Sequence, residues 1–244
     1  MIRSRRKVGN YTRLCRYYDA EWATFSKQYV DLCSHLLAER GIRQARILDL
    51  ACGTGNLAIM LADKGHIVHG IDNSSEMIEI ARHKAVGMPN VKFELRDMRR
   101  FESADRFDLV TCAFDSINYI RETSDLKHML TRVAKTLQKD GLFAFDSNTE
   151  RLYARYHDEV HERNIDGDMF FQKTYYEPDK KLARTVFEFA DGAVEEHLQR
   201  PYDLPELEPC LAAAGLRVIH AFSRFDRSPF TFESGRLICI AGRV

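Results

Sequence analysis

Residues 45–58 read Ala-Arg-Ile-Leu-Asp-Leu-Ala-Cys-Gly-Thr-Gly-Asn-Leu-Ala. The first six residues are a short β-type run, and a glycine-rich turn then leads into a helix expected over 54–64. Outward from this stretch, β-type runs and helical stretches alternate. Strands joined by helices of this length form a parallel sheet, because right-handed crossovers place the helices on its two faces. The next expected strands are 67–71, 91–95, 107–112 and 142–146, and the next expected helices are 73–86 and 124–138.

The alternation is interrupted after residue 148. A helix is expected over 151–163, and β-type runs separated by turn residues then predict a β-meander insertion at 167–202. Strands resume beyond it and complete a seven-stranded sheet. We therefore expect one α/β domain over 1–244, with a doubly wound, mostly parallel sheet and an N-terminal helical lid at 1–40. The β-type runs are 169–176, 181–189 and 194–201, and the last two expected strands are 216–222 and 236–241.

Composition limits the partners that we expect. Lys plus Arg and Asp plus Glu each number 36, so the formal charge is zero, whereas duplex-binding proteins usually carry a basic excess. The basic start, which includes Arg3 and Arg5, is expected to be a frayed terminus. Six cysteines without a C-x-x-C pair, and no apolar run near ~18 residues, indicate a cytoplasmic protein without a nucleic-acid or membrane partner. Monomer and homodimer both remain open.

The glycine loop allows two interpretations. Gly53 and Gly55 fit a G-x-G-x-x-A pattern, and Asp72 follows Gly53 by 19 residues, as in dinucleotide-binding enzymes. Asp49, however, ends the preceding strand, and its carboxylate would repel a pyrophosphate bound at the helix N-terminus. S-adenosylmethionine (SAM) carries a sulfonium and an ammonium instead, so this acid favours SAM. An NAD(P)-dependent oxidoreductase and a non-catalytic SAM-binding module remain the alternatives.

Two further acids follow strand ends. Asp72 is expected to accept hydrogen bonds from two ribose hydroxyls, and Asp97 from an adenine amino group while Met98 packs on the ring. The alternatives are that Asp72 only stabilises the end of a helix and that Asp97 is a solvated acid in a loop. Gly55 is expected to leave room for the ligand, so that a valine there would abolish binding without unfolding the chain.

Four motifs together resemble class I SAM-dependent methyltransferases. They are Asp49-Leu-Ala-Cys-Gly-Thr-Gly55, Gly70-Ile-Asp72-Asn-Ser-Ser-Glu-Met77, Arg96-Asp97-Met98 and Phe114-Asp-Ser-Ile-Asn-Tyr119. The last motif, with an aromatic N-terminal segment, is similar to the branch that methylates small molecules, including amino-sugar and glycine N-methyltransferase-like members. In two respects the chain differs from the family pattern. Ala51 replaces the usual first loop glycine, and the N/D-P-P-Y signature of adenine and glutamine N-methyltransferases is absent.

The resemblance implies methyl transfer from SAM to a small-molecule acceptor, at N or O, with S-adenosylhomocysteine as the second product. Cofactor contacts are expected along the loop and the strand ends, and acceptor contacts from the N-terminal segment and the loop after the fourth strand. The expected cofactor contacts are Tyr17, Trp22, Asp49, Ala51, Cys52, Gly53, Gly55, Asp72, Asn73, Met77, Asp97, Met98, Ala113 and Phe114, and the acceptor contacts are Tyr11, Tyr18, Asn118 and Tyr119.

Catalytic groups are less constrained by the sequence. An amine acceptor needs only a base that removes a proton, and Tyr119, Asp115 and His197 are the candidates, which remain unranked. His157 and His161 have i, i+4 spacing on the helix expected over 151–163, but the sequence is not H-E-x-x-H and supplies no third ligand. We expect a solvated helix face there and no metal.

Overall fold

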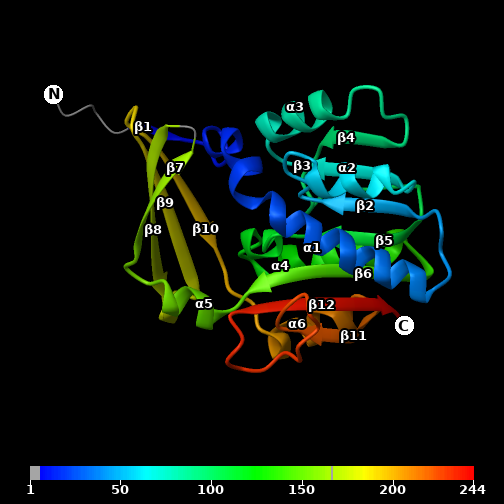
Figure 1. Ribbon diagram of the computed structural model, residues 1–244. Helices are drawn as coiled ribbons and strands as arrows, with labels where there is room; N and C mark the ends of the chain where they lie inside the picture. The colour runs from blue at the N-terminus through cyan, green and yellow to red at the C-terminus, as the bar shows by residue number, and fades with distance from the viewer. Residues whose placement is uncertain (1–5, 166) are drawn as a thin grey trace.

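The computed structural model describes residues 6–165 and 167–244 and contains two β-sheets (Figure 1). The larger sheet has seven strands in the order β11-β12-β6-β5-β2-β3-β4. Pairing is parallel from β6 to β4 and antiparallel at β12. The expected doubly wound, mostly parallel α/β fold is confirmed. Its strands are β2 (Arg46–Leu50), β3 (Ile67–Asp72), β4 (Val91–Leu95), β5 (Phe107–Cys112), β6 (Leu137–Asn148), β11 (Leu216–Phe222) and β12 (Arg236–Arg243).

Helices cover both faces of this sheet. The apolar sides of α1, α2 and α3 pack into one core, and those of α4 and α6 pack into a second core on the opposite face. This arrangement buries the central strands on both sides, as their nearly continuous apolar sequences require. The helices are α1 (Tyr18–Glu39), α2 (Asn56–Asp63), α3 (Ser75–Lys84), α4 (Thr123–Thr136), α5 (Glu150–Arg155) and α6 (Leu204–Ala213), with 3₁₀ turns η1 (Leu14–Arg16), η2 (Ser116–Tyr119) and η3 (Pro178–Lys180).

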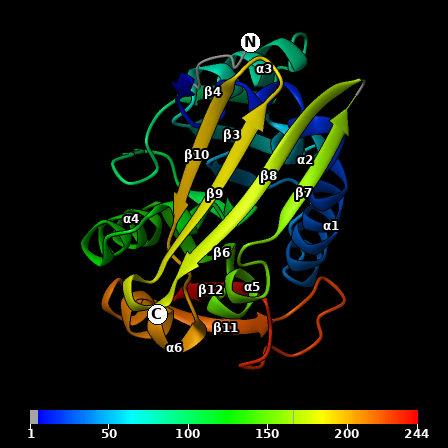
Figure 2. The same cartoon turned by 90° about the vertical axis from the view of Figure 1, so that its left-hand side faces the viewer.

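The smaller sheet stands at one end of the larger one (Figure 1). It has the strand order β1-β10-β9-β8-β7, and β10, β9, β8 and β7 lie side by side in Figure 2. Only β1 pairs in parallel, since it comes from the chain start rather than from the meander. The strands are β1 (Arg6–Val8), β7 (Val160–Ile165), β8 (Asp168–Glu177), β9 (Leu182–Phe189) and β10 (Ala193–Gln199).

Three local predictions were wrong. The helix expected over 151–163 ends at Arg155, and β7 begins at Val160, because this stretch alternates in exposure and pairs with β8. The additional β structure therefore begins before residue 167. The helix expected from residue 73 begins at Ser75, because Ser74 is its N-cap and accepts the Met77 N–H at 3.2 Å with its hydroxyl.

The chain start is only partly a lid. Residues 6–8 form β1, and Lys7 pairs with Glu196 of β10, so this described part of the basic segment is ordered against the second sheet. The C-terminal half of α1 contributes Tyr29 and Leu36 to the core that α1, α2 and α3 form on one face of the large sheet. Residues 9–25 lie between these two parts of the segment. Arg3 and Arg5, for which a frayed terminus was expected, lie outside the described residues.

Two features are absent from residues 6–165 and 167–244. No helix in them is long and apolar enough to cross a membrane. The same residues contain no cluster of three His, Cys, Asp or Glu side chains arranged for a metal ion. The six cysteines are all buried and unpaired.

Candidate functional site

The carboxyl ends of four parallel strands meet at the edge of the large sheet that faces the small sheet. Asp49 lies in β2, Asp72 ends β3, Asp97 follows β4, and Phe114 follows β5. In open α/β sheets ligands bind at this edge, near the point where strand order reverses. Here β2 is that point, since the chain runs from β2 to β3 and β4 on one side and then to β5 on the other.

The loop after β2 uses left-handed backbone at three positions, Ala51 (φ 53°), Gly53 (φ 55°) and Gly55 (φ 81°). A β-carbon on Gly53 would lie 3.8 Å from the ring of Tyr18 and 4.0 Å from the Met77 sulfur, so this glycine faces the site. One on Gly55 would lie 2.6 Å from the Phe93 ring, in the packing between α2, α3 and the sheet. The expectation that the missing side chain of Gly55 leaves room in the site is wrong, and it is Gly53 whose missing side chain faces the pocket.

Asp72 connects two loops. Its Oδ2 accepts the Gly53 N–H and its Oδ1 accepts the Ser74 N–H, each at 2.8 Å. Burial raises its pKa, and these backbone hydrogen bonds oppose the rise. A carboxylate has about four acceptor positions. The two that remain can accept a pair of ligand hydroxyls on the cavity side.

Asp49 is almost completely buried, with 2% of its surface exposed. Its Oδ1 accepts the Thr111 hydroxyl at 2.7 Å, but its Oδ2 has no hydrogen-bond partner among the described residues. Burial raises the pKa of Asp49 to about 7. A buried carboxylate oxygen without a partner is energetically unfavourable. A bound cation or a strong hydrogen-bond donor would therefore stabilise this oxygen.

Asp97 is already engaged by a neighbour. Arg99 binds both carboxylate oxygens, with Nε–Oδ distances of 3.0 Å, and donates its backbone N–H to Oδ1 at 2.8 Å. Burial works against ionisation, but these donors outweigh it and hold the pKa of Asp97 below its usual range. The carboxylate is thus ionised and fixed. Met98 lies beside it and packs against the core, with its sulfur 4.0 Å from that of Cys112.

Three cavities open around this edge. The edge pocket, about 370 Å³, lies between the ends of β3 and β4 and the N-terminal segment. The roof pocket, about 440 Å³, lies beneath the small sheet, and the loop pocket is a small recess inside the glycine loop. The expected residues Ala51, Gly53, Asp72, Asn73, Met77, Asp97 and Met98 line the edge pocket, Asp49, Cys52, Ala113 and Phe114 line the loop pocket, and Trp22, Asp115 and His197 line the roof pocket.

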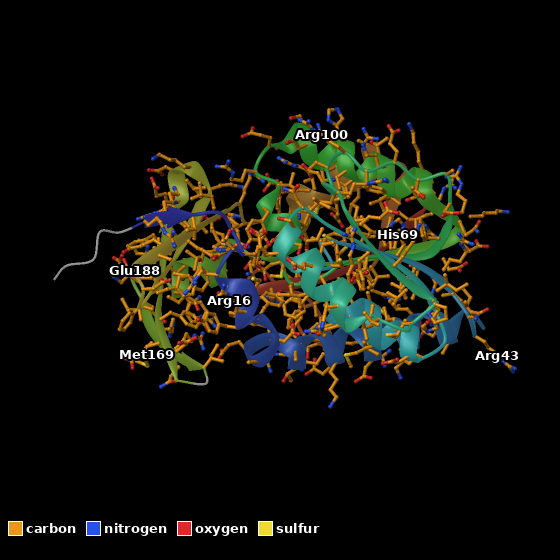
Figure 3. All side chains as sticks on the ribbon, turned by 90° about the horizontal axis from the view of Figure 1, so that it is seen from above. Arg16, Arg43, His69, Arg100, Met169 and Glu188 are labelled. Carbon is orange, nitrogen blue, oxygen red and sulfur yellow. The ribbon has the colours of Figure 1, made fainter. Side chains whose placement is uncertain are left out.

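Tyrosines stand where the cavities meet. Tyr18 lines all three pockets, and Tyr11 and Tyr119 line both the edge and the roof pockets. The Tyr18 ring lies edge-on to Tyr11 at 6.0 Å and is 5.2 Å from Trp22 between ring centroids. In Figure 3, Glu188 and Met169 mark the small sheet, and Arg16 marks the N-terminal segment beside it. Tyr11, Tyr18 and Tyr119 therefore lie at the place where the edge, roof and loop pockets meet.

The roof pocket is polar on the side of the small sheet. His197 of β10, Thr185 of β9 and Thr174 of β8 are cross-strand neighbours and line it. On the opposite side of the pocket, the Asp115 carboxylate accepts hydrogen bonds from the Gln199 amide at 2.8 Å and from the Arg236 guanidinium at 3.2 Å. The cavity thus combines hydroxyl, amide and charged groups with aromatic rings.

Besides Gly55, two expected site residues lie outside the three pockets. Tyr17 packs on Phe170 of the small sheet, with ring centroids 5.3 Å apart, and donates its hydroxyl to Asp168 at 2.9 Å. Asn118 is fully buried, and its amide holds backbone groups of Asn148 and Arg200. Neither lines any of the three pockets. We therefore interpret Tyr17 and Asn118 as structural residues, because the polar group of each is hydrogen-bonded within the protein.

The histidine pair expected on a helix face is also placed differently. His157 lies in a turn and His161 in β7, so the two do not share a helix. His161 lines the roof pocket and pairs with Glu159 at 3.1 Å.

The sequence did not reveal part of the site. Glu195, His197 and Gln199 share one face of β10 by their spacing of two, but the sequence does not tell which face is inward. Arg236 carries no motif. Residues that line the edge and roof pockets beyond the expected set are Asn10, Ser74, Arg96, Arg99, Ser116, Ile120, Leu14, Phe25, Asn148, Leu152, Tyr153, Tyr156, His161, Arg163, Gln172, Thr174, Thr185, Phe187, Gln199 and Arg236.

Comparison with known proteins agrees with this geometry. Residues 47–141 match the model of a methyltransferase domain. A protein named as a methyltransferase in Geobacillus sp. (strain WCH70) is 31% identical over 207 residues, which are 80% of this chain and 83% of that protein. This chain belongs to the class I SAM-dependent methyltransferases. The expected family and enzyme class are confirmed, and the alternative of an NAD(P)-dependent oxidoreductase is wrong.

Two other similarities describe the methyltransferase further. A SAM-dependent methyltransferase structure from Clostridium acetobutylicum has a TM-score of 0.84 at 25% identity and covers 96% of this chain and 98% of that one. The dTDP-3-amino-3,6-dideoxy-α-D-glucopyranose N,N-dimethyltransferase of Streptomyces fradiae is 34% identical over 118 residues, which are 48% of this chain and 45% of that enzyme.

The residues present fit SAM. The unpartnered Asp49 oxygen in the loop pocket suits the ammonium, and the free acceptor positions of Asp72 in the edge pocket suit ribose hydroxyls. When bound, SAM supplies an electrophilic methyl group on a sulfonium. The aromatic rings at the junction suit that cation, because ring faces attract positive charge.

Proposed function

We propose that this methyltransferase transfers a methyl group to the nitrogen of a small, polar, hydroxyl-bearing amine held in the roof pocket. The observation that carries the proposal is the junction at Tyr18, which lines the edge, roof and loop pockets together. A donor extended through the edge and loop pockets would present its methyl group at this junction. An acceptor in the roof pocket would meet it from the opposite side, as in-line displacement requires.

The roof pocket supports a polar acceptor. The neighbouring Thr185 and Thr174 offer hydroxyl groups, while Trp22 and Phe187 offer ring surfaces. Rings beside hydrogen-bonding groups can hold both the apolar and the hydroxyl faces of a sugar ring. The relative from Streptomyces fradiae, which is named as an amino-sugar N,N-dimethyltransferase, supports the same acceptor class.

The proposed cofactor contacts are narrower than the sequence suggested. Asp72 would hold the ribose, Asp49 the ammonium, and Met98 the adenine ring, with Gly53 giving room for close approach. Asp97 lies at the edge pocket with its carboxylate fixed by Arg99, so it would accept the adenine amino group from a set position. Tyr11, Tyr18 and Tyr119 would border the junction at which the donor methyl group meets the acceptor.

The test is a methylation assay with SAM and a defined amine. The probe is dTDP-3-amino-3,6-dideoxy-α-D-glucopyranose, and the same sugar without the nucleotide shows whether the diphosphate is needed. We expect a mass gain of one or two methyl groups on the sugar and formation of S-adenosylhomocysteine. The matching 3-hydroxy sugar nucleotide is the control, since transfer to it instead would place methylation at oxygen. No methylation of either amine would contradict the acceptor class.

We also propose one domain over 1–244 acting in the cytoplasm, without a nucleic-acid or membrane partner. Six buried, unpaired cysteines support a reducing compartment, where thiols persist. Monomer and homodimer remain to be distinguished by light scattering after size-exclusion chromatography. A stable change in mass when duplex DNA is added would contradict the proposal on partners.

A further inference from the structure

A continuous chain of hydrogen bonds leads from the junction of the pockets into the small sheet. The hydroxyls of Tyr11 and Tyr119 lie 2.7 Å apart, and the Tyr119 hydroxyl lies 2.7 Å from Nδ1 of His197. On the far side of the ring, Nε2 of His197 lies 3.3 Å from Oε2 of Glu195. The two tyrosines are partly buried and line the edge and roof pockets, whereas His197 and Glu195 are 2% and 0% exposed.

The carboxylate of Glu195 determines which nitrogen of His197 carries a proton. Glu195 also accepts backbone N–H groups from Tyr11 and Leu14 at 3.0 Å and from Arg13, and such donors stabilise a carboxylate. Because a carboxylate only accepts, Nε2 of His197 carries a proton, and Nδ1 is an acceptor whenever the ring is neutral. Tyr119 then donates to Nδ1, and Tyr11 donates to Tyr119. The lone pairs of the Tyr11 oxygen remain to accept a proton at the junction.

We propose that Tyr11, Tyr119, His197 and Glu195 form a proton relay that deprotonates the acceptor before methyl transfer. This inference rests on the proposed function, since it concerns an amine in the roof pocket. An amine in water is mostly an ammonium, which has no lone pair to attack a methyl group. The relay supplies the missing base, which touches the acceptor through Tyr11 and stores the proton at His197.

The proton balance is complete within the protein. The acceptor R–NH₃⁺ gives one proton to the Tyr11 oxygen, Tyr11 gives its own proton to Tyr119, and Tyr119 gives its own to Nδ1 of His197. The result is R–NH₂ and an imidazolium paired with Glu195. After transfer the product leaves as R–NH₂⁺–CH₃, and His197 returns its proton to solvent when the pocket opens. No oxidant or further reactant is needed.

Other groups near the relay do not replace it. Burial, with a smaller effect of Asp115, raises the pKa of Tyr119 well above its usual range, and burial does the same for Tyr11, so both phenols stay protonated and pass protons on. Asp115 itself is held by Gln199 and Arg236. The titratable groups that act on the relay from neighbouring elements are Asp72, Asp115, Tyr18 and Tyr153.

The first test is kinetic, with SAM and dTDP-3-amino-3,6-dideoxy-α-D-glucopyranose as the probe, from pH 7 to pH 9.5. His197→Gln should lower kcat at pH 7 by roughly 10²–10⁴-fold, the usual contribution of a general base. The deficit should shrink toward high pH, where the free amine already predominates. Tyr119→Phe, which keeps the ring, should behave in the same way, and Tyr176→Phe is the matched control, since that hydroxyl binds Glu150 away from the three pockets.

A purely structural role would give a different result, namely an equal loss of kcat at every pH, and that result or no loss would overturn the relay. The second test needs no acceptor. In protein labelled with ¹⁵N-histidine, the His197 signal, assigned by its loss in His197→Gln, should show a neutral ring at pH 8 with its proton on Nε2. A proton on Nδ1, or an imidazolium at pH 8, would overturn the proposal. If the wild-type enzyme leaves the probe unmethylated, the acceptor class fails and the NMR result alone decides the relay.

Discussion

The Oδ2 atom of Asp72 accepts the backbone N–H of Gly53 at 2.8 Å, so the acid that ends the second strand of the large sheet also holds the loop after the first. The same carboxylate accepts the Ser74 N–H that begins the following turn. One side chain therefore sets the separation of two loops that border the edge pocket. Its spacing of 19 residues from Gly53 reflects the length of one helix and one strand between them.

Replacing Asp72 should weaken SAM binding. We expect Asp72→Ala to cost about 1.5–3 kcal/mol of binding free energy, the range for a hydrogen bond to a charged group, with a further loss because Gly53 is released. Asp72→Asn should lose less, since one oxygen can still accept. Calorimetric titration with SAM measures both, and Asp63→Ala, at an exposed position near the end of α2, is the control. Unchanged affinity in a folded Asp72→Ala protein would remove Asp72 from the site.

Asp49 should make SAM binding depend on pH. Burial raises its pKa to about 7, so the free protein carries a protonated carboxyl below that value. The SAM ammonium prefers the ionised form, and binding below pH 7 must therefore release a proton. We expect affinity to rise with pH from 5.5 to about 7, by at most tenfold per unit, and then to level off. In Asp49→Asn the affinity should be lower and this part of the pH dependence should vanish; a wild-type profile that is flat would contradict the assignment.

The same raised pKa has a consequence for stability. An acid whose pKa is higher in the folded than in the unfolded chain favours folding less as pH rises between the two values. For Asp49 the window runs from about 4 to about 7, since the unfolded side chain titrates near ~3.9. Asp49→Asn removes this contribution. The denaturation midpoint of Asp49→Asn, taken relative to that of the wild type, should therefore increase as the pH rises through this window.

Two glycines separate binding from folding. Gly53→Val would place methyl groups toward Tyr18 and Met77, in the cavity, so SAM binding should be lost while most of the fold remains. Gly55→Val would drive its side chain into Phe93, and overpacking of this kind costs about 1–3 kcal/mol of stability. Both positions have positive φ, so backbone strain is common to the pair. Thermal melts and SAM titrations on the two variants check the difference; equal stability with equal loss of binding would refute it.

The sheet and the cofactor side could be predicted because their signals are local. A strand end, a glycine loop and an acid lie within about one helix and one strand of each other in the sequence, and parallel topology brings the strand ends together. Asp49, Asp72 and Met98 therefore appear where expected. Gly55 was misassigned, since the motif fixes its backbone but does not show which neighbour its missing side chain would meet.

The acceptor side depends on long-range pairing, which one sequence does not encode in a readable way. His197 meets Tyr119 across 78 positions and Arg236 meets Asp115 across 121. Tyr17 and Tyr18 are adjacent, yet one packs on the small sheet and the other lines the pockets, because neighbouring residues leave a 3₁₀ turn in different directions. Aromatic content alone did not distinguish them.

The N-terminal segment should be needed for folding of the small sheet as well as for turnover. The N-terminal lid that the sequence predicts over 1–40 would imply that residues 1–22 can be removed without loss of the fold. In the structure, β1 pairs with β10, Leu14 and Tyr17 enter the core of the small sheet, and Glu195 receives backbone donors from this segment. Truncation would remove these backbone donors and leave the buried Glu195 with His197 as its partner, and a buried charge that loses most of its hydrogen bonds is strongly destabilising.

We therefore expect removal of residues 1–22 to lower the melting temperature and to increase hydrogen exchange in β8, β9 and β10, while the large sheet keeps its protection. The comparison that isolates covering from folding is Tyr18→Ala, which keeps the backbone donors to Glu195 and removes only the ring at the junction. Its melting temperature should stay close to that of the wild type, and the rate of the bound complex should fall, because closing residues act by excluding water and fixing the line of attack. Hydrogen exchange by mass spectrometry and single-turnover methylation measure the two effects. If the truncated chain keeps full protection in β10, the segment is a cover alone, and its role as part of the small sheet is wrong.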